Sequence, residues 1–270
     1  MSAPEFDPEL YALRPWYHDF GLLGFDTTFR EVPLTLGDRA RRASEFFGSM
    51  INRARRATRT TSVREIFRHV SSPHALNQPV KEQHLMTLLE SALLDLGDGP
   101  ACLELFSADG YYSCRIKALS ARARIVGVEL DPEQVRRAEV ITKRLDFQDV
   151  VYRREDAGDF LETSSDAFDL VLCAGGLYHL ADPLRLLRAL ERAGRRFLVV
   201  QSVVTLETED PTYFVQPAPG WRHGCRFTHA WLRARLNELG WEVHEESRAE
   251  LPGNPRAHDR GSSFFLCHRR

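Results

Sequence analysis

Continuous apolar runs alternate with segments of helical periodicity along most of the chain. The first clear example spans residues 101–129, where apolar runs at 101–106 and 124–128 enclose a segment in which Tyr112, Ile116 and Leu119 recur at helical spacing. Short apolar runs are typical of parallel strands buried on both faces, and the intervening spacing is typical of an amphipathic helix. The pattern predicts strand, turn, helix and strand, with Glu129 directly after the second strand.

The same alternation continues to residue 269. We expect further strands at 150–154, 167–174, 195–204, 241–251 and 262–269, and further helices at 80–96, 131–145, 184–193 and 229–240. Pro132 suits a first helical turn, whereas Thr228 and Gly240 suit the two ends of the last helix. Pro73 and Pro79 bracket an expected linker. Helices that alternate with strands in this way indicate an α/β fold with a Rossmann-like sheet of seven strands.

Residues 1–80 precede the sheet and are too long for a tail. Within them, segment 38–70 combines helical spacing with nine arginines against three acidic residues. It is either a solvated helical face or a basic surface for RNA or a phosphate-bearing substrate. Lysine occurs only at Lys81, Lys117 and Lys143, so arginine supplies most cations throughout the chain. That general preference favours the solvated face.

Composition narrows the class of protein. With 43% hydrophobic and 10% aromatic residues, a chain of 270 residues can bury the core of one large domain. No apolar run approaches the roughly 20 residues of a membrane span, and the acidic start lacks the pattern of a secretory signal. The five cysteines form no CxxC pair, so we expect free thiols and a cytoplasmic location. A net charge of −2 gives no overall footprint for nucleic acid.

The turn after the first strand and the acid after the second indicate a nucleoside site. Glu129 lies 19 residues after Gly110 (129 − 110), the spacing of a carboxylate that accepts ribose hydroxyl groups. A dinucleotide fingerprint would have two more glycines, at the positions of Phe106 and Ala108. Because a pyrophosphate needs bare backbone amides at close range, their loss argues against NAD or FAD. A nucleoside without phosphates, such as S-adenosylmethionine (SAM), tolerates the change.

The two stretches that carry these residues resemble a known family. ELFSADG at 104–110 is similar to the first motif of the class I SAM-dependent methyltransferases, and VGVELDP at 126–132 is similar to the end of their second strand. The resemblance implies SAM as the cofactor and a sheet whose last strand is antiparallel. For Asp156 the resemblance implies that its carboxylate accepts a hydrogen bond from the adenine amino group of SAM. The alternative is that Asp156 only caps a helix. The resemblance implies cofactor-binding roles at the ends of the first four strands, for Glu104, Phe106, Ala108, Gly110, Glu129, Leu130, Asp156, Ala157, Ala174, Gly175 and Tyr178.

Three further stretches, LRPWYHDF, GYYSCRI and GLYHLADPL, are similar to a narrower group, the tRNA wobble-uridine methyl- and carboxymethyltransferases. In that group the N-terminal segment packs over SAM. This implies that residues 1–80 form a lid on a SAM-binding domain at 81–270. Trp16, Tyr17 and His18 would then help to close the site. The alternative is that this aromatic cluster only packs in the hydrophobic core. Carboxymethyl members hold an extra carboxylate partly with the tyrosine matched by Tyr178, so carboxy-SAM in place of SAM is left open. In those members a lysine before the first strand accompanies this tyrosine. Here it could only correspond to Lys81, whose neighbouring sequence is different.

Several polar residues are candidates for chemistry at the strand ends. His179 follows Gly175 and Gly176, and imidazole suits a general base near neutral pH. The alternative is a structural histidine bonded to backbone, and His18 is the second candidate base. No spacing demands a metal, and we expect none. Two loops on the same edge are expected to form the acceptor pocket with Tyr213, Trp221, Arg222, His223, His258 and Arg260.

These observations favour a SAM-dependent methyltransferase that acts at oxygen on a small polar or aromatic acceptor. One alternative is an RNA enzyme that uses segment 38–70. Another is a protein of the same fold that binds SAM without catalysis, because two glycines are missing from the first motif. A homodimer is left open, and the sequence does not name the acceptor.

Overall fold

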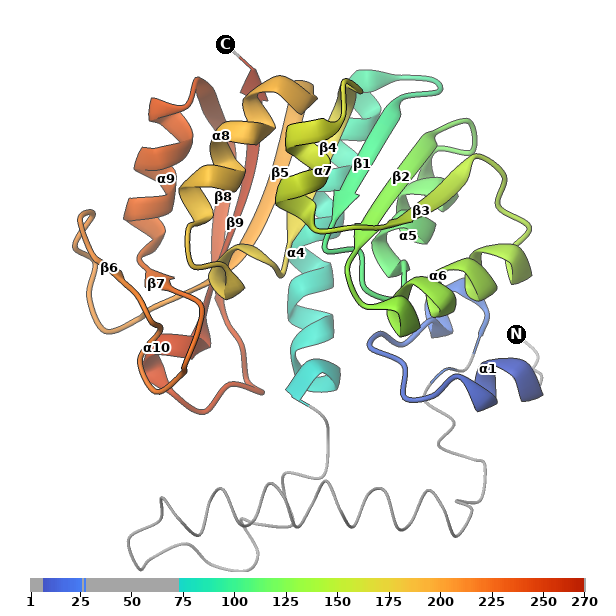
Figure 1. Cartoon of the computed structure of the whole chain (residues 1–270), viewed down its shortest axis with the longest axis horizontal. Coiled ribbons are helices and arrows are strands. Elements are labelled where there is room, and N and C mark those ends of the chain that lie inside the picture. The colour runs from blue at the N-terminus through green and yellow to red at the C-terminus, as the bar shows by residue number, and fades with distance from the viewer. Residues whose placement is uncertain (1–6, 26, 28–72, 270) are drawn as a thin grey trace, which may run out of the picture.

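The centre of the molecule is one seven-stranded sheet. The structure, a computed structural model, describes residues 7–25, 27 and 73–269. The strands are β1 Ala101–Leu105, β2 Arg124–Glu129, β3 Val150–Arg154, β4 Phe168–Ala174, β5 Gly194–Val204, β8 Trp241–Glu250 and β9 Gly261–Arg269. They lie in the order β3-β2-β1-β4-β5-β9-β8 (Figure 1). The first five are parallel, whereas β9 is antiparallel to both β5 and β8, which confirms the expected topology.

Helices connect the strands and cover both faces of the sheet. They are α4 Pro73–Leu96, α5 Tyr111–Leu119, α6 Pro132–Arg144, α7 Ala157–Thr163, α8 Pro183–Ala193, α9 His229–Glu238 and α10 Ala257–Arg260. Ahead of α4 the structure describes α1 Pro8–Ala12 and the 3-10 turn η1 Gly21–Leu23. A second 3-10 turn, η2 Leu177–His179, follows β4, and a two-stranded ladder joins β6 Phe214–Val215 to β7 Arg226–Phe227.

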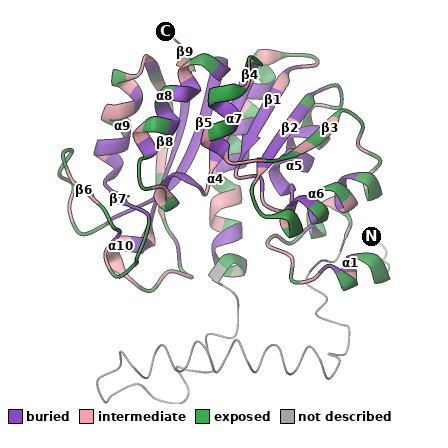
Figure 2. Ribbon diagram, in the orientation of Figure 1, coloured by how far each residue is buried: buried purple, intermediate pink, exposed green. Residues whose placement is uncertain are grey.

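Two hydrophobic cores lie on opposite faces of the sheet, because successive strand residues point to opposite sides. In β4, Val171 and Cys173 pack with α7, α8 and α9, whereas Leu170 and Leu172 pack with α4, α5 and α6. Both sets are fully buried, so each apolar run reads as continuous in the sequence. Figure 2 shows this buried band through the central strands, with the exposed residues on the outer sides of the helices.

The parallel strands end at a common edge, the lower one in Figure 1. The chain moves from β1 to β2 on one side and from β3 to β4 on the other, so the order reverses between β1 and β4. Such a reversal is where ligands bind on open α/β sheets. The segment around α1 lies below this edge beside α6, and Arg144 of α6 joins the two elements by ion pairs to Asp7 and Glu9. The β6–β7 ladder and α10 lie at the same edge beyond β5.

Residues 73–79 differ from expectation, because they form the first turns of α4 rather than a linker. Pro79 removes one helical hydrogen bond, but buried contacts of the two residues before it hold the segment. Asn77 Oδ1 accepts from the Gly253 amide at 2.8 Å, and Gln78 Oε1 accepts from the Asp19 amide at 2.9 Å. The helix therefore begins at Pro73 rather than at residue 80, where the sequence predicted its start. The basic segment 38–70 lies outside the described residues.

The remaining elements follow the sequence with small shifts. The first strand ends at Leu105, one residue early, and the loop 251–261 contains α10. Neither α7 nor the β6–β7 ladder was expected. The helix ends are as expected at α9, where the Thr228 side chain accepts from the Trp231 amide and Gly240 has a φ of 78°. All five cysteines are buried free thiols.

Candidate functional site

The loop after β1 keeps the backbone of a glycine-rich turn although it contains a single glycine. Phe106, Ala108 and Gly110 have φ angles of 60°, 45° and 77°. Positive φ is uncommon for residues with a Cβ and costs roughly 1–2 kcal/mol each. A Cβ on Gly110 would also lie 2.4 Å from the Tyr152 hydroxyl oxygen. The three positions that the sequence aligned with family glycines therefore share one left-handed conformation.

Glu129 lies at the end of β2 and faces this loop. Its Oε2 accepts from the Ala108 amide at 3.0 Å, and its Oε1 accepts from the amides of Leu130 and Asp131 at 2.8 and 2.9 Å. The side chain is half-buried, and Leu130 beside it is 62% exposed. A carboxylate has about four acceptor positions. Three amides thus fix the orientation of Glu129 and leave it able to accept a hydroxyl group.

Glu104 lies beneath the loop rather than at the edge. It is buried, and the Ser113 hydroxyl of α5 donates to its carboxyl group. Burial raises the pKa of Glu104 to about 8, against the opposing effect of the Ser113 hydrogen bonds. A protonated Glu104 ties β1 to α5. The sequence placed this residue among those that contact the cofactor, and in the structure it is only 2% exposed.

The third strand end is built around a helix cap. Asp156 Oδ1 accepts from the amides of Gly158 and Asp159 at 2.8 and 3.2 Å, and Ala157 begins α7 as a buried residue. The capping alternative for Asp156 is thus realised through one oxygen. Its other oxygen, Oδ2, accepts no hydrogen bond from the described residues. Asp156 can therefore cap α7 and still accept a hydrogen bond from a ligand.

The fourth strand end combines open space with a close contact. Gly175 has a φ of 78°, and no atom lies within 4 Å of the position of a Cβ. Gly176 is the opposite case, because a Cβ there would lie 2.0 Å from Cδ2 of Phe106. The Phe106 ring therefore lies against the Gly176 backbone. Ala174 is half-buried at the end of β4.

His179 projects from η2 with its ring unbonded within the described part of the chain. Its amide bonds to the Gly176 carbonyl at 2.9 Å, and its ring packs on Tyr178 at 4.1 Å between centroids. Surrounding protein atoms lower the pKa of His179, and the positive charges of Arg226 and Lys81 lower it further, although part of the ring reaches solvent. The structural alternative required a bonded ring, so the exposed His179 remains available for proton transfer.

The N-terminal segment joins the site through Tyr17 and His18. Both backbone amides donate to Asp109 Oδ2, at 2.8 and 2.7 Å, and His18 Nδ1 lies 2.6 Å from Asp109 Oδ1. Burial raises the pKa of Tyr17, followed by the negative fields of Tyr178, Asp109 and Glu129. The Tyr17 hydroxyl therefore lies near the cofactor-binding candidates of two strands.

Trp16 belongs to the packing of the N-terminal segment. Its Nε1 donates to the Leu10 carbonyl at 2.9 Å, and its ring meets Phe20 edge-on at 5.6 Å. This is the core-packing alternative for that member of the aromatic cluster. Tyr17 and His18 therefore contact the loop after β1, whereas Trp16 contacts other residues of the N-terminal segment.

A buried ion pair holds the end of η2 to the two loops beyond β5. Arg226 of β7 donates to Asp259 Oδ1 through Nε at 2.8 Å and Nη2 at 2.5 Å. Its Nη1 also donates to the Tyr178 carbonyl at 3.3 Å, with the guanidinium carbon 5.3 Å from the centre of the Tyr178 ring. Asp259 Oδ2 accepts from Trp221 Nε1 at 3.2 Å. Arg226 thus links the insertion, α10 and Tyr178.

The acceptor-binding candidates divide into exposed and paired side chains. Trp221, Arg222 and His223 are exposed on the insertion at the sheet edge, and Tyr213 is half-buried. His258 Nδ1 lies 3.5 Å from Glu207 Oε1, and Arg260 Nε lies 3.0 Å from Glu250 Oε2. Arg260 is therefore already paired, whereas Arg222 and His223 are exposed on the insertion, and Trp221 is exposed although its Nε1 donates to Asp259.

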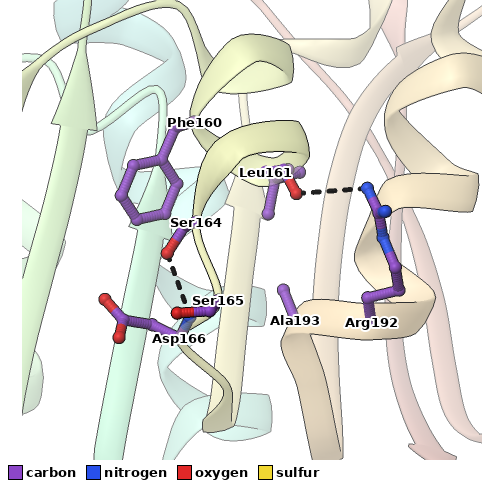
Figure 3. A pocket seen from close by; sticks show the side chains of 7 residues that line it. All are labelled: Phe160, Leu161, Ser164, Ser165, Asp166, Arg192 and Ala193. Carbon is purple, nitrogen blue, oxygen red and sulfur yellow. Dashed lines mark hydrogen bonds between the residues drawn. The ribbon is translucent and has the colours of Figure 1, made fainter.

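A cavity of about 160 Å³ lies away from all these residues (Figure 3). It is lined by Phe160 and Leu161 of α7, the turn at 164–166, and Arg192 and Ala193 at the end of α8, where Arg192 Nη2 donates to the Leu161 carbonyl at 3.4 Å. These segments precede β4 and β5, so the cavity lies at the amino ends of the strands. It has no part in the site described above.

Across 7–25, 27 and 73–269, no three histidine, cysteine or acidic residues gather as metal ligands would. No helix of those ranges has the length and apolar character of a membrane span.

Sequence reasoning missed the residues that position the candidates. Asp109 lies between two residues of the first motif, and Arg226 is one more arginine in an arginine-rich chain. His74, whose ring packs on Tyr17 at 4.2 Å, is remote in sequence. Only the presence of a carboxylate inside a turn otherwise made of small residues and Phe106 could have drawn attention to Asp109.

Comparison with known proteins places this geometry in a family. A family model described as a methyltransferase domain matches residues 96–236, from the end of α4 into α9. The matched range contains the ends of β1, β2, β3 and β4. None of the curated proteins compared with the chain matches its sequence.

Solved structures share the fold. Magnesium protoporphyrin IX methyltransferase of Synechocystis PCC 6803 with bound SAM is 13% identical, covers 88% of this chain and 100% of its own, and gives a TM-score of 0.55. The 1,6-didemethyltoxoflavin-N1-methyltransferase of Burkholderia thailandensis, bound to 1,6-didemethyltoxoflavin and S-adenosylhomocysteine (SAH), is 13% identical, covers 88% and 92%, and gives 0.54. The [4+2]-cyclase SpnF is 18% identical, covers 68% and 79%, and gives 0.56. Because the family model spans more than half of the sequence, the chain belongs to the methyltransferase domain family.

Proposed function

We propose that the chain transfers a methyl group from SAM to a hydroxyl oxygen of a small-molecule acceptor at the carboxyl edge of its sheet. The observation that carries the proposal is the position of Glu129 at the end of β2, next to the switch point, where three backbone amides hold it beside a left-handed loop. Two proteins of this fold support it: magnesium protoporphyrin IX methyltransferase contains SAM, and 1,6-didemethyltoxoflavin-N1-methyltransferase contains SAH.

The donor set at this edge fits SAM. Glu129 would accept the ribose hydroxyl groups, and Asp156 Oδ2 would accept the adenine amino group while Oδ1 caps α7. The open space at Gly175 would admit the methionine portion of SAM close to the backbone, beside Ala174. When bound, SAM supplies an electrophilic methyl group attached to a sulfonium. The Phe106 ring and Tyr178 would exclude water around that group, which strengthens the electrostatics of the site.

The acceptor must lose a proton when its oxygen attacks, and two histidines are placed for that role. His179 follows the Gly175–Gly176 turn, and its lowered pKa keeps the imidazole neutral at pH 7. His18 approaches from the N-terminal segment. The exposed side chains of the insertion, Trp221 and Arg222 among them, would bind an aromatic or anionic acceptor from the outside.

Phe106 favours a second candidate, a protein that binds SAM without catalysis. Its ring occupies space against Gly176 that a glycine at position 106 would leave open. An RNA acceptor is a third candidate, but the basic segment that motivates it lies outside the described residues.

Incubation with ¹³C-methyl SAM and pools of phenolic, sugar and polyketide alcohols tests the proposal, with SAH and labelled products scored by mass spectrometry. We expect one compound to gain one labelled methyl group for each SAH formed. Binding of SAM with neither product nor SAH would favour the non-catalytic protein. Label found only in added tRNA would establish the RNA enzyme.

A further inference from the structure

Asp109 connects the first-motif loop to the N-terminal segment. It lies between Ala108 and Gly110, and its side chain has no exposed surface. It accepts three hydrogen bonds from that segment: the Tyr17 and His18 amides bind Oδ2, and His18 Nδ1 binds Oδ1 at 2.6 Å. A buried carboxylate needs such partners to stay ionised. Asp109 is therefore built to receive residues 17 and 18.

The contact fixes which nitrogen of His18 carries the proton. An ionised carboxylate only accepts hydrogen bonds, so neutral His18 must hold its proton on Nδ1. That tautomer leaves the lone pair on Nε2, which makes no hydrogen bond with any residue the structure describes. The amides of Tyr17 and His18 already occupy Oδ2, so the carboxylate itself cannot turn to release the ring.

Aromatic packing fixes the orientation of the His18 ring. Tyr111 stacks on it at 4.9 Å with an angle of 20°, and Tyr112 meets it edge-on at 5.4 Å. Tyr111 is itself bonded to Glu82 of α4. The side chain of His18 is only 10% exposed. The ring therefore has a defined direction as well as a defined tautomer.

Tyr17 and His74 connect His18 to the rest of the site. Tyr17 lies 4.7 Å from its ring and 4.2 Å from His74 of α4. The positive fields of Lys81, His18 and His179 all lower the pKa of His74, after burial. His18, His74 and His179 thus converge on one region. No carboxylate of the described residues pairs with His179, whereas His18 is paired with Asp109.

We propose that Asp109 is a positioning residue and that His18, through Nε2, is the general base of the methyl transfer. The inference rests on the proposed function and identifies the base within it. As the acceptor oxygen forms its bond to the methyl carbon, its proton passes to Nε2, and the carbon–sulfur bond breaks with its electrons on sulfur. Asp109 stabilises the resulting imidazolium and later the proton leaves to water.

Asp109→Asn tests the inference with little change in shape. The asparagine oxygen can still accept from the two backbone amides, but its NH₂ group would face Nδ1 and donate to it. His18 would then carry its proton on Nε2 and lose its basic lone pair at the site. Asp19→Asn is the control, because Asp19 is exposed and lies on the same segment.

The first readout is the tautomer of His18 in the full chain without ligand, from ¹⁵N-histidine NMR near pH 8.5, about two units above the ordinary pKa of imidazole. His18→Gln assigns the signal. We expect Nδ1–H in the wild type and in Asp19→Asn, and Nε2–H in Asp109→Asn. An Nε2–H tautomer in the wild type would overturn the proposal.

The second readout is turnover with the compound that gains a methyl group, paired with SAH affinity. Asp109→Asn and His18→Gln should each lower kcat about 10²–10⁴-fold while the Kd of SAH stays within about threefold of the wild type (under 1 kcal/mol). Loss of activity only in His179→Gln would assign the base to His179 and overturn the proposal. If the wild type bound neither SAM nor SAH, the proposed function would fail instead, and the tautomer would still be measured.

Discussion

Replacing Asp259 by alanine should destabilise the fold far more than breaking an exposed ion pair nearby. Arg226 and Asp259 are 4% and 6% exposed, so the variant leaves a buried guanidinium without its counter-charge. Removing one partner of a buried pair costs about 3–5 kcal/mol. Carbonyls of His258, Tyr178 and Cys225 still accept from Arg226 at 3.1, 3.3 and 2.6 Å. Because these bonds remain, we expect the lower end, about 3 kcal/mol.

Urea unfolding of the full chain measures the change in the free energy of unfolding. The matched control is Glu209→Ala, which breaks the ion pair between Glu209 and Arg248. Their side chains are 70% and 50% exposed, and such an exposed pair contributes about 0–1 kcal/mol. The double variant Arg226→Met/Asp259→Leu should recover most of the loss, since no unpaired charge is left. Equal losses in Asp259→Ala and Glu209→Ala would refute the reasoning, and so would a double variant less stable than Asp259→Ala.

Two further substitutions and one binding assay test other features of the molecule. Gly176→Ala should cost about 1–3 kcal/mol in urea unfolding, because its φ of −111° is unstrained and the three atoms nearest to the new Cβ all belong to the Phe106 ring. Adding Phe106→Ala should relieve that cost, and no relief would place the conflict elsewhere. Glu104 holds its proton more tightly in the folded state, where its pKa is about 8 against the ordinary 4.5, so the folded state loses stability as pH rises between these values. Glu104→Gln should flatten that part of the plot of unfolding free energy against pH. An unchanged slope would contradict a buried, protonated Glu104. Filter binding with tRNA at two salt concentrations should show no salt-dependent affinity, whereas a steep fall with salt would revive an RNA acceptor.

Hydrophobic periodicity was sufficient to predict the sheet. Each central strand is buried on both faces, so Val171 and Leu172 are equally apolar although they enter different cores. The α7 helix was missed because its seven residues give too short a pattern, and the ladder between β6 and β7 pairs only two residues from each strand. The turns at 73–79 were missed because Pro79 predicts a break, and the contacts that override it come from Asp19 and Gly253.

The candidate site was predictable where one strand end carries the residue and hidden where two segments meet. Glu129 followed from its spacing after Gly110. The partner of His18 did not, because Asp109 is 91 positions away and resembles an ordinary turn residue. The sequence aligned Glu104 with the acid of the first motif, but it did not reveal that the side chain is buried and bonded to Ser113. Periodicity reports which residues are inside, whereas positioning contacts depend on the three-dimensional arrangement of loops.

Calorimetric titration of SAH into the wild type, Glu129→Ala and Glu133→Ala tests the central claim most directly. Glu133 is a matched control because it is an exposed glutamate four residues further along, in the first turn of α6. We expect the wild type and Glu133→Ala to bind SAH alike. Glu129→Ala should bind SAH about 5–150-fold more weakly, because the ribose loses charge-assisted hydrogen bonds worth about 1–3 kcal/mol. Equal affinity in a folded Glu129→Ala variant, or no binding by the wild type, would contradict a cofactor site at this edge of the sheet.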